Sequence, residues 1–443
     1  MRSLKSAKLM PLLIPLILIF MLVISVMNVM EYNGNITADY NKHIKAAEKY
    51  LEKDILIDAV SEYRQALSIK PNDYDTAIKL AGLYKQMDNS SQMIWAYKAA
   101  ITADSEKLEP YIFIADYYLD KNNNAEAYSI LSQAKKKIAS EEIDSRILKI
   151  KSEYHVSQVR YEEMLPYFGF PGSDTSYSVV KYQGKYGLIS KGSNKLTIKC
   201  EYEDIGLYSD YVIPVKIDGS YYYMNSKKYK KRVPDEPMDY LGAYSDGYAP
   251  AKKGSTYGYL DKNMKEYHFE YDFAGGFLNG VAAVKKDGKW AVINSSFKNV
   301  TDFIFDDILL NEYNYCSCYK LFFAKRDGKY YLYNTNGECK SEGYDDARMF
   351  ASTKEPAAVK SGDKWGFISK DGKIVIQPAY QNAYSFNVGY APFCENGKWG
   401  CIDQEGHVLI NPQFDEMHPF DNTGEAIVKD KGLLKILSVA VYK

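Results

Sequence analysis

Internal repetition constrains this chain more than any other feature of its sequence. Between about residues 40 and 139, small and aromatic residues recur with a period of 34 residues. The matching sets are Ala47, Ala81 and Ala115; Tyr50, Tyr84 and Tyr118; Ala59, Met93 and Ala127; Tyr63, Tyr97 and Leu131; and Ala66, Ala100 and Ala134. This period predicts stacked helix–turn–helix units, because the small residues let two antiparallel helices approach closely.

A second repeat occupies the C-terminal half. Seven times a glycine is followed, after one or two residues, by an aromatic residue and a short apolar run, and a degenerate eighth copy lies near Gly432. Asp-Gly and Asn-Gly pairs such as Asn396-Gly397 favour tight hairpins, so each copy predicts a three-stranded meander with the aromatic residue as a repeated structural core residue. These aromatic residues, spaced 35, 36, 33, 40, 35 and 34 apart, are Tyr186, Tyr221, Tyr257, Trp290, Tyr330, Trp365 and Trp399.

Both arrays resemble known repeat families. The first is similar to the tetratricopeptide repeat (TPR), whose signature matches Ala47, Tyr50, Ala59, Tyr63, Ala66 and Pro71 in the first unit. The amphipathic stretch from Glu141 to about Val159 would serve as its capping helix. The second resembles the bacterial WG (KWG) repeat, most clearly between Ala358 and Tyr380, and this resemblance covers roughly residues 178–440.

The expected fold class is therefore α+β multidomain, with a TPR-like α-solenoid followed by an all-β repeat array. Propeller blades usually need about 40 residues and four strands, whereas these units are shorter and offer about three strands. We therefore expect an open or curved stack of β units, with propeller-like closure as the alternative.

The N-terminus predicts a membrane anchor. Residues 9–30 carry no charge, and a helix of this length crosses a hydrocarbon core of about 30 Å. Arg2, Lys5 and Lys8 precede the apolar run, which places the N-terminus in the cytoplasm and exports the rest of the chain. We expect a single-pass signal anchor in the cell membrane, with a cleaved signal peptide as the alternative. The expected domains are a cytoplasmic stub at 1–8, the transmembrane anchor at 9–30, TPR-like repeats with a capping helix at 37–162, a linker at 163–177 and WG-type repeats at 178–443.

The TPR resemblance implies a partner-binding groove lined by the first helix of each pair. This stripe is mildly acidic and lacks most of the basic residues that would grip a C-terminal carboxylate. Solvated helix faces of a simple spacer are the alternative interpretation. The candidate partner-binding residues are Asn41, Glu48, Glu52, Asp75, Gln86, Glu109, Asp116 and Asp120.

The 42 tyrosines gather mainly in the β half. Neighbouring strand residues point to opposite faces, so the run Tyr221-Tyr222-Tyr223 predicts that some rings face away from the core. Exposed rings would suit sugars or peptide segments, although tyrosine is also simply a good strand former.

Motifs for chemistry are nearly absent. We expect no catalytic residues, no cofactor and no metal site, because the five histidines match none of the usual spacings. His407 and His418, with Asp403 and Asp415 nearby, are the only candidates for such a site, and we interpret both histidines as loop residues. The six cysteines are expected to be buried free thiols, and a hairpin turn at Asn396-Gly397 would place Cys394 opposite Trp399, too far from Cys401 for a disulfide.

The expected function is that of a non-enzymatic scaffold. A net charge of -1 argues against nucleic acid as a partner. We expect a membrane-anchored, extracytoplasmic protein–protein interaction scaffold with protein partners in the cell envelope. The alternatives are a module that binds cell-wall glycan (peptidoglycan) and, with less support, an envelope hydrolase.

Overall fold

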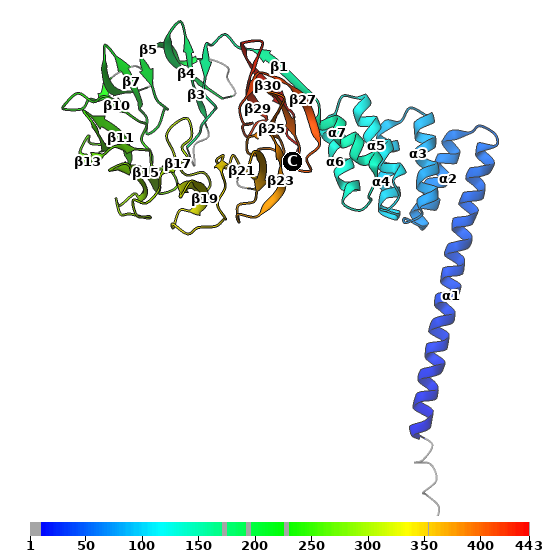
Figure 1. Cartoon of the computed structure of the whole chain (residues 1–443). Coiled ribbons are helices and arrows are strands. Elements are labelled where there is room, and N and C mark those ends of the chain that lie inside the picture. The colour runs from blue at the N-terminus through cyan, green and yellow to red at the C-terminus, as the bar shows by residue number, and fades with distance from the viewer. Residues whose placement is uncertain (1–9, 171–174, 192–195, 226–229, 353, 443) are drawn as a thin grey trace, which may run out of the picture. The chain divides into compact units, whose positions relative to one another are not determined.

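The chain folds into two compact units in a computed structural model that describes residues 10–170, 175–191, 196–225, 230–352 and 354–442. The helical unit extends to Ile150, and the β unit begins at Lys151 (Figure 1). The predicted order of helical repeats before β repeats is confirmed.

The helical unit begins with one continuous helix, α1 (Met10–Leu51). The predicted anchor and the first helix of the repeats therefore form a single element, with no break between residues 30 and 37. Within Leu18–Leu51, this helix has a stretch that is long and apolar enough to cross a membrane. The predicted cytoplasmic stub at 1–8 lies outside the described residues.

Three helix pairs and a final helix follow the predicted 34-residue period. Ala47, Ala59 and Ala66 are completely buried, which explains the recurrence of alanine where helices meet. The side chains of Asp73, Asn89 and Asn123 cap helices by accepting backbone N–H groups. After α1 the helices are α2 (Leu56–Ile69), α3 (Tyr74–Gln86), α4 (Ser90–Ala103), α5 (Glu109–Asp120), α6 (Asn124–Lys135) and α7 (Glu141–Lys151).

Gly82 lies inside α3, where glycine weakens a helix. A Cβ atom built on it meets nothing within 4 Å. We expect Gly82→Ala to raise the free energy of unfolding of the helical unit by about 0.5–1 kcal/mol, because alanine restricts the unfolded chain more than glycine does. Urea denaturation followed by circular dichroism at the helix band would measure the change, and a decrease would show that the site lacks the space described.

The β unit consists of eight antiparallel sheets, called blades 1 to 8. Blades 1 to 4 contain β2 (Glu163–Met164), β3 (Tyr177–Tyr182), β4 (Lys185–Ser190) and β5 (Leu196–Tyr202); β6 (Asp204–Ile205), β7 (Ile213–Ile217), β8 (Ser220–Met224) and β9 (Lys230–Arg232); β10 (Tyr240–Leu241), β11 (Tyr248–Lys253), β12 (Thr256–Asp261) and β13 (Glu266–Tyr271); and β14 (Phe273–Ala274), β15 (Val281–Lys286) and β16 (Lys289–Asn294).

The remaining four sheets complete the series. Blades 5 to 8 contain β17 (Asp307–Ile308), β18 (Leu321–Arg326) and β19 (Lys329–Asn334); β20 (Asp346–Ala347), β21 (Ala357–Ser361), β22 (Lys364–Ile368) and β23 (Ile374–Tyr380); β24 (Asn382–Ala383), β25 (Ala391–Glu395), β26 (Lys398–Ile402) and β27 (Val408–Phe414); and β28 (Glu416–Met417), β29 (Glu425–Asp430) and β30 (Leu433–Val439), joined by β1 (Tyr154–Gln158).

Strand β1 closes the eight blades into a ring. It pairs antiparallel with β30 from Tyr154 opposite Val439 to Gln158 opposite Lys435, so the first strand of the unit completes its last blade (Figure 1). Blades 8 and 1 also share an apolar cluster that contains Val180, Ile189 and Ile427. The unit is an eight-bladed, propeller-like ring. The expected open or curved stack is wrong, and the alternative of propeller-like closure is confirmed.

The strand count was underestimated because the first strand of each blade is only two residues long. In blade 2, Asp204 follows the last strand of blade 1 after the single residue Glu203. Six of the eight sheets have four strands instead of the predicted three. Closure also moves the predicted boundaries, because β1 lies in the range assigned to the helical repeats and β2 in the predicted linker at 163–177.

The first strands of the blades face the axis of the ring. Leu207, Ala243 and Leu278 follow the first strands of blades 2, 3 and 4, and they share one cluster with Tyr315 of blade 5. The segment 309–320 of blade 5 continues to blade 1. There the Tyr313 hydroxyl donates to the Pro166 carbonyl at 2.8 Å, and the Tyr315 ring stacks on Phe168 with centroids 5.1 Å apart. This segment therefore crosses the axis and fills part of it.

Candidate binding surfaces

The predicted groove residues of the helical unit form one surface, the inner-helix face. They lie on α1, α3 and α5, except Glu52, which lies in the turn directly after α1. Glu48 of α1 pairs with Lys79 of α3 at 3.3 Å. Asp116 of α5 accepts two hydrogen bonds from the Arg146 guanidinium of α7, at 3.0 and 3.1 Å. The Glu109 carboxylate lies 3.5 Å from the Tyr74 hydroxyl. These contacts join α1, α3, α5 and α7 along one face. Its residues are Asn41, Ile44, Glu48, Glu52, Asp75, Ile78, Gln86, Glu109, Ile112, Asp116 and Asp120.

The inner-helix face combines apolar residues with free negative charge. Ile44, Ile78 and Ile112 are half-buried and occupy equivalent positions in successive repeats. In the described part of the chain, the exposed carboxylates of Asp75 and Asp120 form no ion pair, nor does that of Glu52. Lys79 and Arg146 are already paired with Glu48 and Asp116. The face can thus attract a cationic segment while it buries apolar side chains.

The repeated aromatic residues of the β unit are structural. None of them is exposed, and Trp365 keeps only 3% of its surface accessible. In blades 1 to 5 a lysine on the neighbouring strand lies over the aromatic ring, as Lys181 does over Tyr186 at 5.2 Å and Lys325 over Tyr330 at 5.2 Å. These contacts cover one face of the aromatic ring in each of these five blades.

The glycine after the aromatic residue makes room for the fourth strand. A Cβ atom on Gly400 would lie 2.3 Å from the Ile410 carbonyl oxygen, and one on Gly366 would lie 2.6 Å from that of Ile376. Blades with this glycine have fourth strands of six or seven residues. Where Tyr222 replaces it, the described part of the fourth strand has three residues. The described parts of blades 4 and 5, with Ala291 and Tyr331, show no fourth strand.

The comparison with protein families selects these same blades. The family described as WG containing repeat matches residues 186–221, 257–290, 365–399 and 399–433. Every match begins at an aromatic residue that a glycine follows. The C-terminal unit contains WG repeats. The WG domain, residues 151–443, thus carries both signature residues in blades 1, 3, 6 and 7.

Other comparisons give only distant likeness. No curated protein sequence matches the chain. Among solved structures, MamA is 20% identical with a TM-score of 0.20 over 22% of this chain and 52% of its own, so the chain spans about half of MamA. SycD of Yersinia enterocolitica, in complex with a peptide of the translocator YopD, is 18% identical with a TM-score of 0.21 over 24% of this chain and 88% of its own. Hsv2 of Kluyveromyces lactis is 10% identical with a TM-score of 0.30 over 49% of this chain and 86% of its own.

Among the described residues, three pairs of neighbouring blades in the WG domain are linked by an aspartate that precedes a first strand. Asp415, before blade 8, accepts the Gly432 N–H of its own blade at 3.2 Å and the Lys398 ammonium of blade 7 at 2.6 Å. Asp345 repeats this arrangement between blades 5 and 6 with Lys329 and Gly362. The lysine of the repeat signature thus serves as a link to the next blade.

These links predict acid sensitivity. Hydrogen bonds from Lys289, Lys329 and Lys398 hold the pKa values of Asp306, Asp345 and Asp415 below the usual range. A folded-state pKa below the unfolded value stabilises the fold above about pH 4, and this contribution is lost as pH falls through the folded pKa. The Asp306→Asn, Asp345→Asn, Asp415→Asn triple variant should therefore show a shallower loss of stability below about pH 4. Urea titrations at several pH values measure this slope, and an unchanged slope would contradict it.

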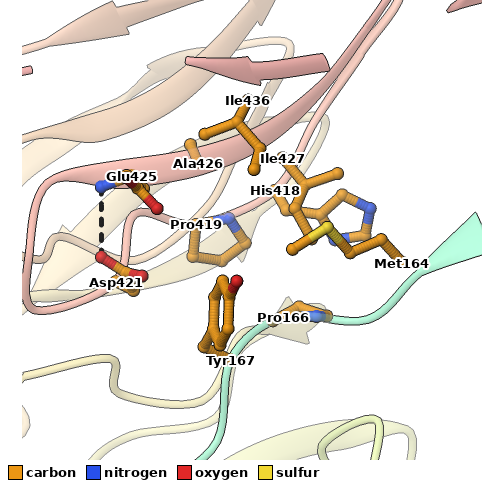
Figure 2. A pocket seen from close by; sticks show the side chains of 10 residues that line it. All are labelled: Met164, Pro166, Tyr167, His418, Pro419, Asp421, Glu425, Ala426, Ile427 and Ile436. Atoms are coloured by element: carbon orange, nitrogen blue, oxygen red, sulfur yellow. Dashed lines mark hydrogen bonds between the residues drawn. The ribbon is translucent and has the colours of Figure 1, made fainter. Parts of the chain in front are cut away.

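The seam between blades 1 and 8 encloses a small cavity (Figure 2). In the figure Met164, Pro166 and Tyr167 of blade 1 face His418 and Ile427 of blade 8. The volume is about 20 Å³, room for about one water molecule.

A lysine of blade 1 reinforces the seam. Lys191 forms ion pairs with Asp421 and Glu425 of blade 8, and its ammonium lies 4.5 Å from the centre of the Tyr167 ring. The Glu425 N–H donates to Asp421 at 3.1 Å, the dashed line in Figure 2. The seam is therefore part of the ring closure, and its cavity is too small for an organic ligand.

The candidate histidines do not form one site. Asp403, Glu405 and His407 have potential ligand atoms within 4.8 Å of one another. However, Asp403 accepts the N–H groups of Glu405 and His407 at 3.1 and 2.8 Å, as Asn294 and Asn334 do in equivalent turns. Turn geometry accounts for Asp403. His418 lies at the seam, and Asp415 links blades 7 and 8.

The tyrosines and cysteines depart partly from expectation. Tyr221, Tyr222 and Tyr223 are at most 8% exposed, so the prediction of outward-facing rings is wrong for this run. Each blade is covered on both sides, with Tyr222 packed toward blade 1 and Tyr223 toward blade 3.

Cys394 lies opposite Trp399 as predicted. All six cysteines are free, but only Cys316 and Cys401 are buried as predicted. Cys339 is exposed, and the other three are partly buried.

Proposed function

We propose that this chain is a membrane-anchored, non-enzymatic scaffold whose helical unit binds a basic, partly apolar segment of a protein partner. The observation that carries the proposal is the inner-helix face, where free carboxylates surround a row of half-buried isoleucines. A segment with lysine or arginine beside apolar residues would satisfy both features, because charge complementarity guides association and apolar burial holds the complex. The WG domain would provide a rigid second module.

Two first-turn carboxylates provide a matched test. Asp75 lies in the first turn of α3 on the inner-helix face, and Glu126 lies in the first turn of α6, the second helix of its pair. Each carboxylate stabilises its own helix by interacting with the helix dipole. Charge reversal should therefore lower helix stability by a similar amount at both positions. Peptides that alternate Lys or Arg with Leu should bind the full chain in detergent, and Asp75→Lys should weaken binding about tenfold, equivalent to about 1.4 kcal/mol. Glu126→Lys should leave it unchanged, and equal weakening by both variants would contradict the proposal.

The envelope location is part of the same proposal. Positive charge before the apolar part of α1 supports a cytoplasmic N-terminus and an exported bulk. The thiol of Cys339 is exposed and can report on which side of the membrane the WG domain lies. A membrane-impermeant thiol reagent should modify it in intact cells, whereas modification only after lysis would contradict export. Retention on purified cell-wall sacculi that survives Asp75→Lys would instead favour the glycan-binding alternative.

A further inference from the structure

A second concave surface lies inside the WG domain and shares no residue with the inner-helix face. A cavity of about 310 Å³ opens between the first strands of blades 1 to 3 and the segment 312–315 that crosses the ring axis. This volume is at the lower end of the range of about 300–1,000 Å³ found for small-molecule sites. The cavity thus has room for a small organic ligand.

Within the described residues, only part of the negative charge on the cavity wall is neutralised by a cation. Glu163 is paired with Lys181 at 2.7 Å. Asp204 accepts hydrogen bonds from the Tyr221 hydroxyl and from the Ile205 N–H, both neutral donors. Glu312 is exposed and forms no ion pair within the described ranges. Two carboxylates therefore remain for a cationic ligand.

The same wall is aromatic. Tyr186, Tyr240 and Tyr313 line the cavity, and Tyr240 is fixed by edge-to-face contact with Tyr221 at 6.2 Å. Lys181 is an example of an ammonium group bound by this wall. Its Nζ lies 5.2 Å from the Tyr186 ring centre and forms an ion pair with Glu163. Aromatic faces attract cations most strongly where water is excluded.

We propose that this cavity binds a small organic cation. Its ammonium or guanidinium group faces Asp204 and Glu312, and its apolar stem lies against the tyrosine rings. Neither an anion nor a neutral molecule of the same size satisfies the unpaired carboxylates.

Cadaverine and 1,5-pentanediol test the charge requirement, because they differ in their end groups and share an apolar stem. Isothermal titration calorimetry of the full chain in detergent should detect cadaverine and not the diol. The tripeptide acetyl-Gly-Lys-Gly-amide carries the same ammonium group on a peptide. Binding of either cation supports the proposal, and the one that binds shows whether the ammonium belongs to a free amine or to a lysine side chain. Absence of binding by both cations, or equal binding of the diol, would overturn it.

The repeat supplies a matched control variant. Asp204 and Asp307 both begin a two-residue first strand and both accept a signature tyrosine hydroxyl, but only Asp204 lines the cavity. We expect Asp204→Asn to weaken cadaverine binding at least tenfold and Asp307→Asn to leave it unchanged. Glu312→Gln, at an exposed position, should also weaken binding without a change in thermal stability. Equal effects of Asp204→Asn and Asp307→Asn would refute the assignment.

Discussion

Gly400→Ala is expected to lower the free energy of unfolding of the WG domain by about 1–3 kcal/mol, the usual range for overpacking. The added methyl group would lie 2.3 Å from the Ile410 carbonyl oxygen and 2.7 Å from the Pro412 nitrogen. Both atoms belong to the backbone of β27, so no side-chain rotation relieves the contact. Urea denaturation followed by tryptophan fluorescence measures the loss, because Trp399 adjoins the site.

Ala291 provides the comparison for this variant. It occupies the same repeat position in blade 4, where a side chain is accommodated. Ala291→Gly should therefore have a smaller effect, of about 1 kcal/mol. Equal stability of Gly400→Ala and the unaltered protein would mean that β27 does not pass over this glycine.

Leu437→Ala should destabilise the WG domain by about 2–5 kcal/mol, the range for truncation of a buried leucine. Leu437 is completely buried in β30, directly opposite Val156 of β1. Its truncation weakens the blade that closes the ring. Amide hydrogen exchange should show lost protection in β1 together with the lower stability.

Leu433→Ala is the control in the same strand. Leu433 is 50% exposed and precedes the residues that pair with β1, so its truncation should change stability by less than about 0.5 kcal/mol. Rapid exchange of the β1 amides in the unaltered protein would contradict ring closure itself.

Local patterns predicted the elements of this chain well. The buried alanines follow directly from the helical period, and the Gly-aromatic copies identify all eight blades, including the degenerate copy near Gly432. Ring closure escaped prediction because β1, Tyr154–Gln158, carries no repeat signature and pairs with a strand at the far end of the chain. The continuity of α1 was missed because apolar composition ends near Met30 and Asn33-Gly34, a typical helix-ending pair, follows it, yet the helix runs through both residues.

The binding surfaces were predicted only in part. The acidic stripe was visible in the helical spacing, but Arg146, which neutralises Asp116, lies on the capping helix. The WG-domain cavity was missed because Glu312 and Tyr313 come from an irregular segment of blade 5 that reaches blade 1. The spacing of 40 residues between Trp290 and Tyr330, longer than every other spacing, was the available signal of this insertion.

The closing strand also imposes an order on biogenesis. β1 leaves the ribosome long before β30, and at about 5–20 residues per second the interval is on the order of 15–60 s. During this time β1 has no partner strand, and Val180 and Ile189 on blade 1 lack the blade 8 residues that cover them. Loss of only the last dozen residues would leave the newly made chain in this unfinished state, exposed to chaperones and proteases.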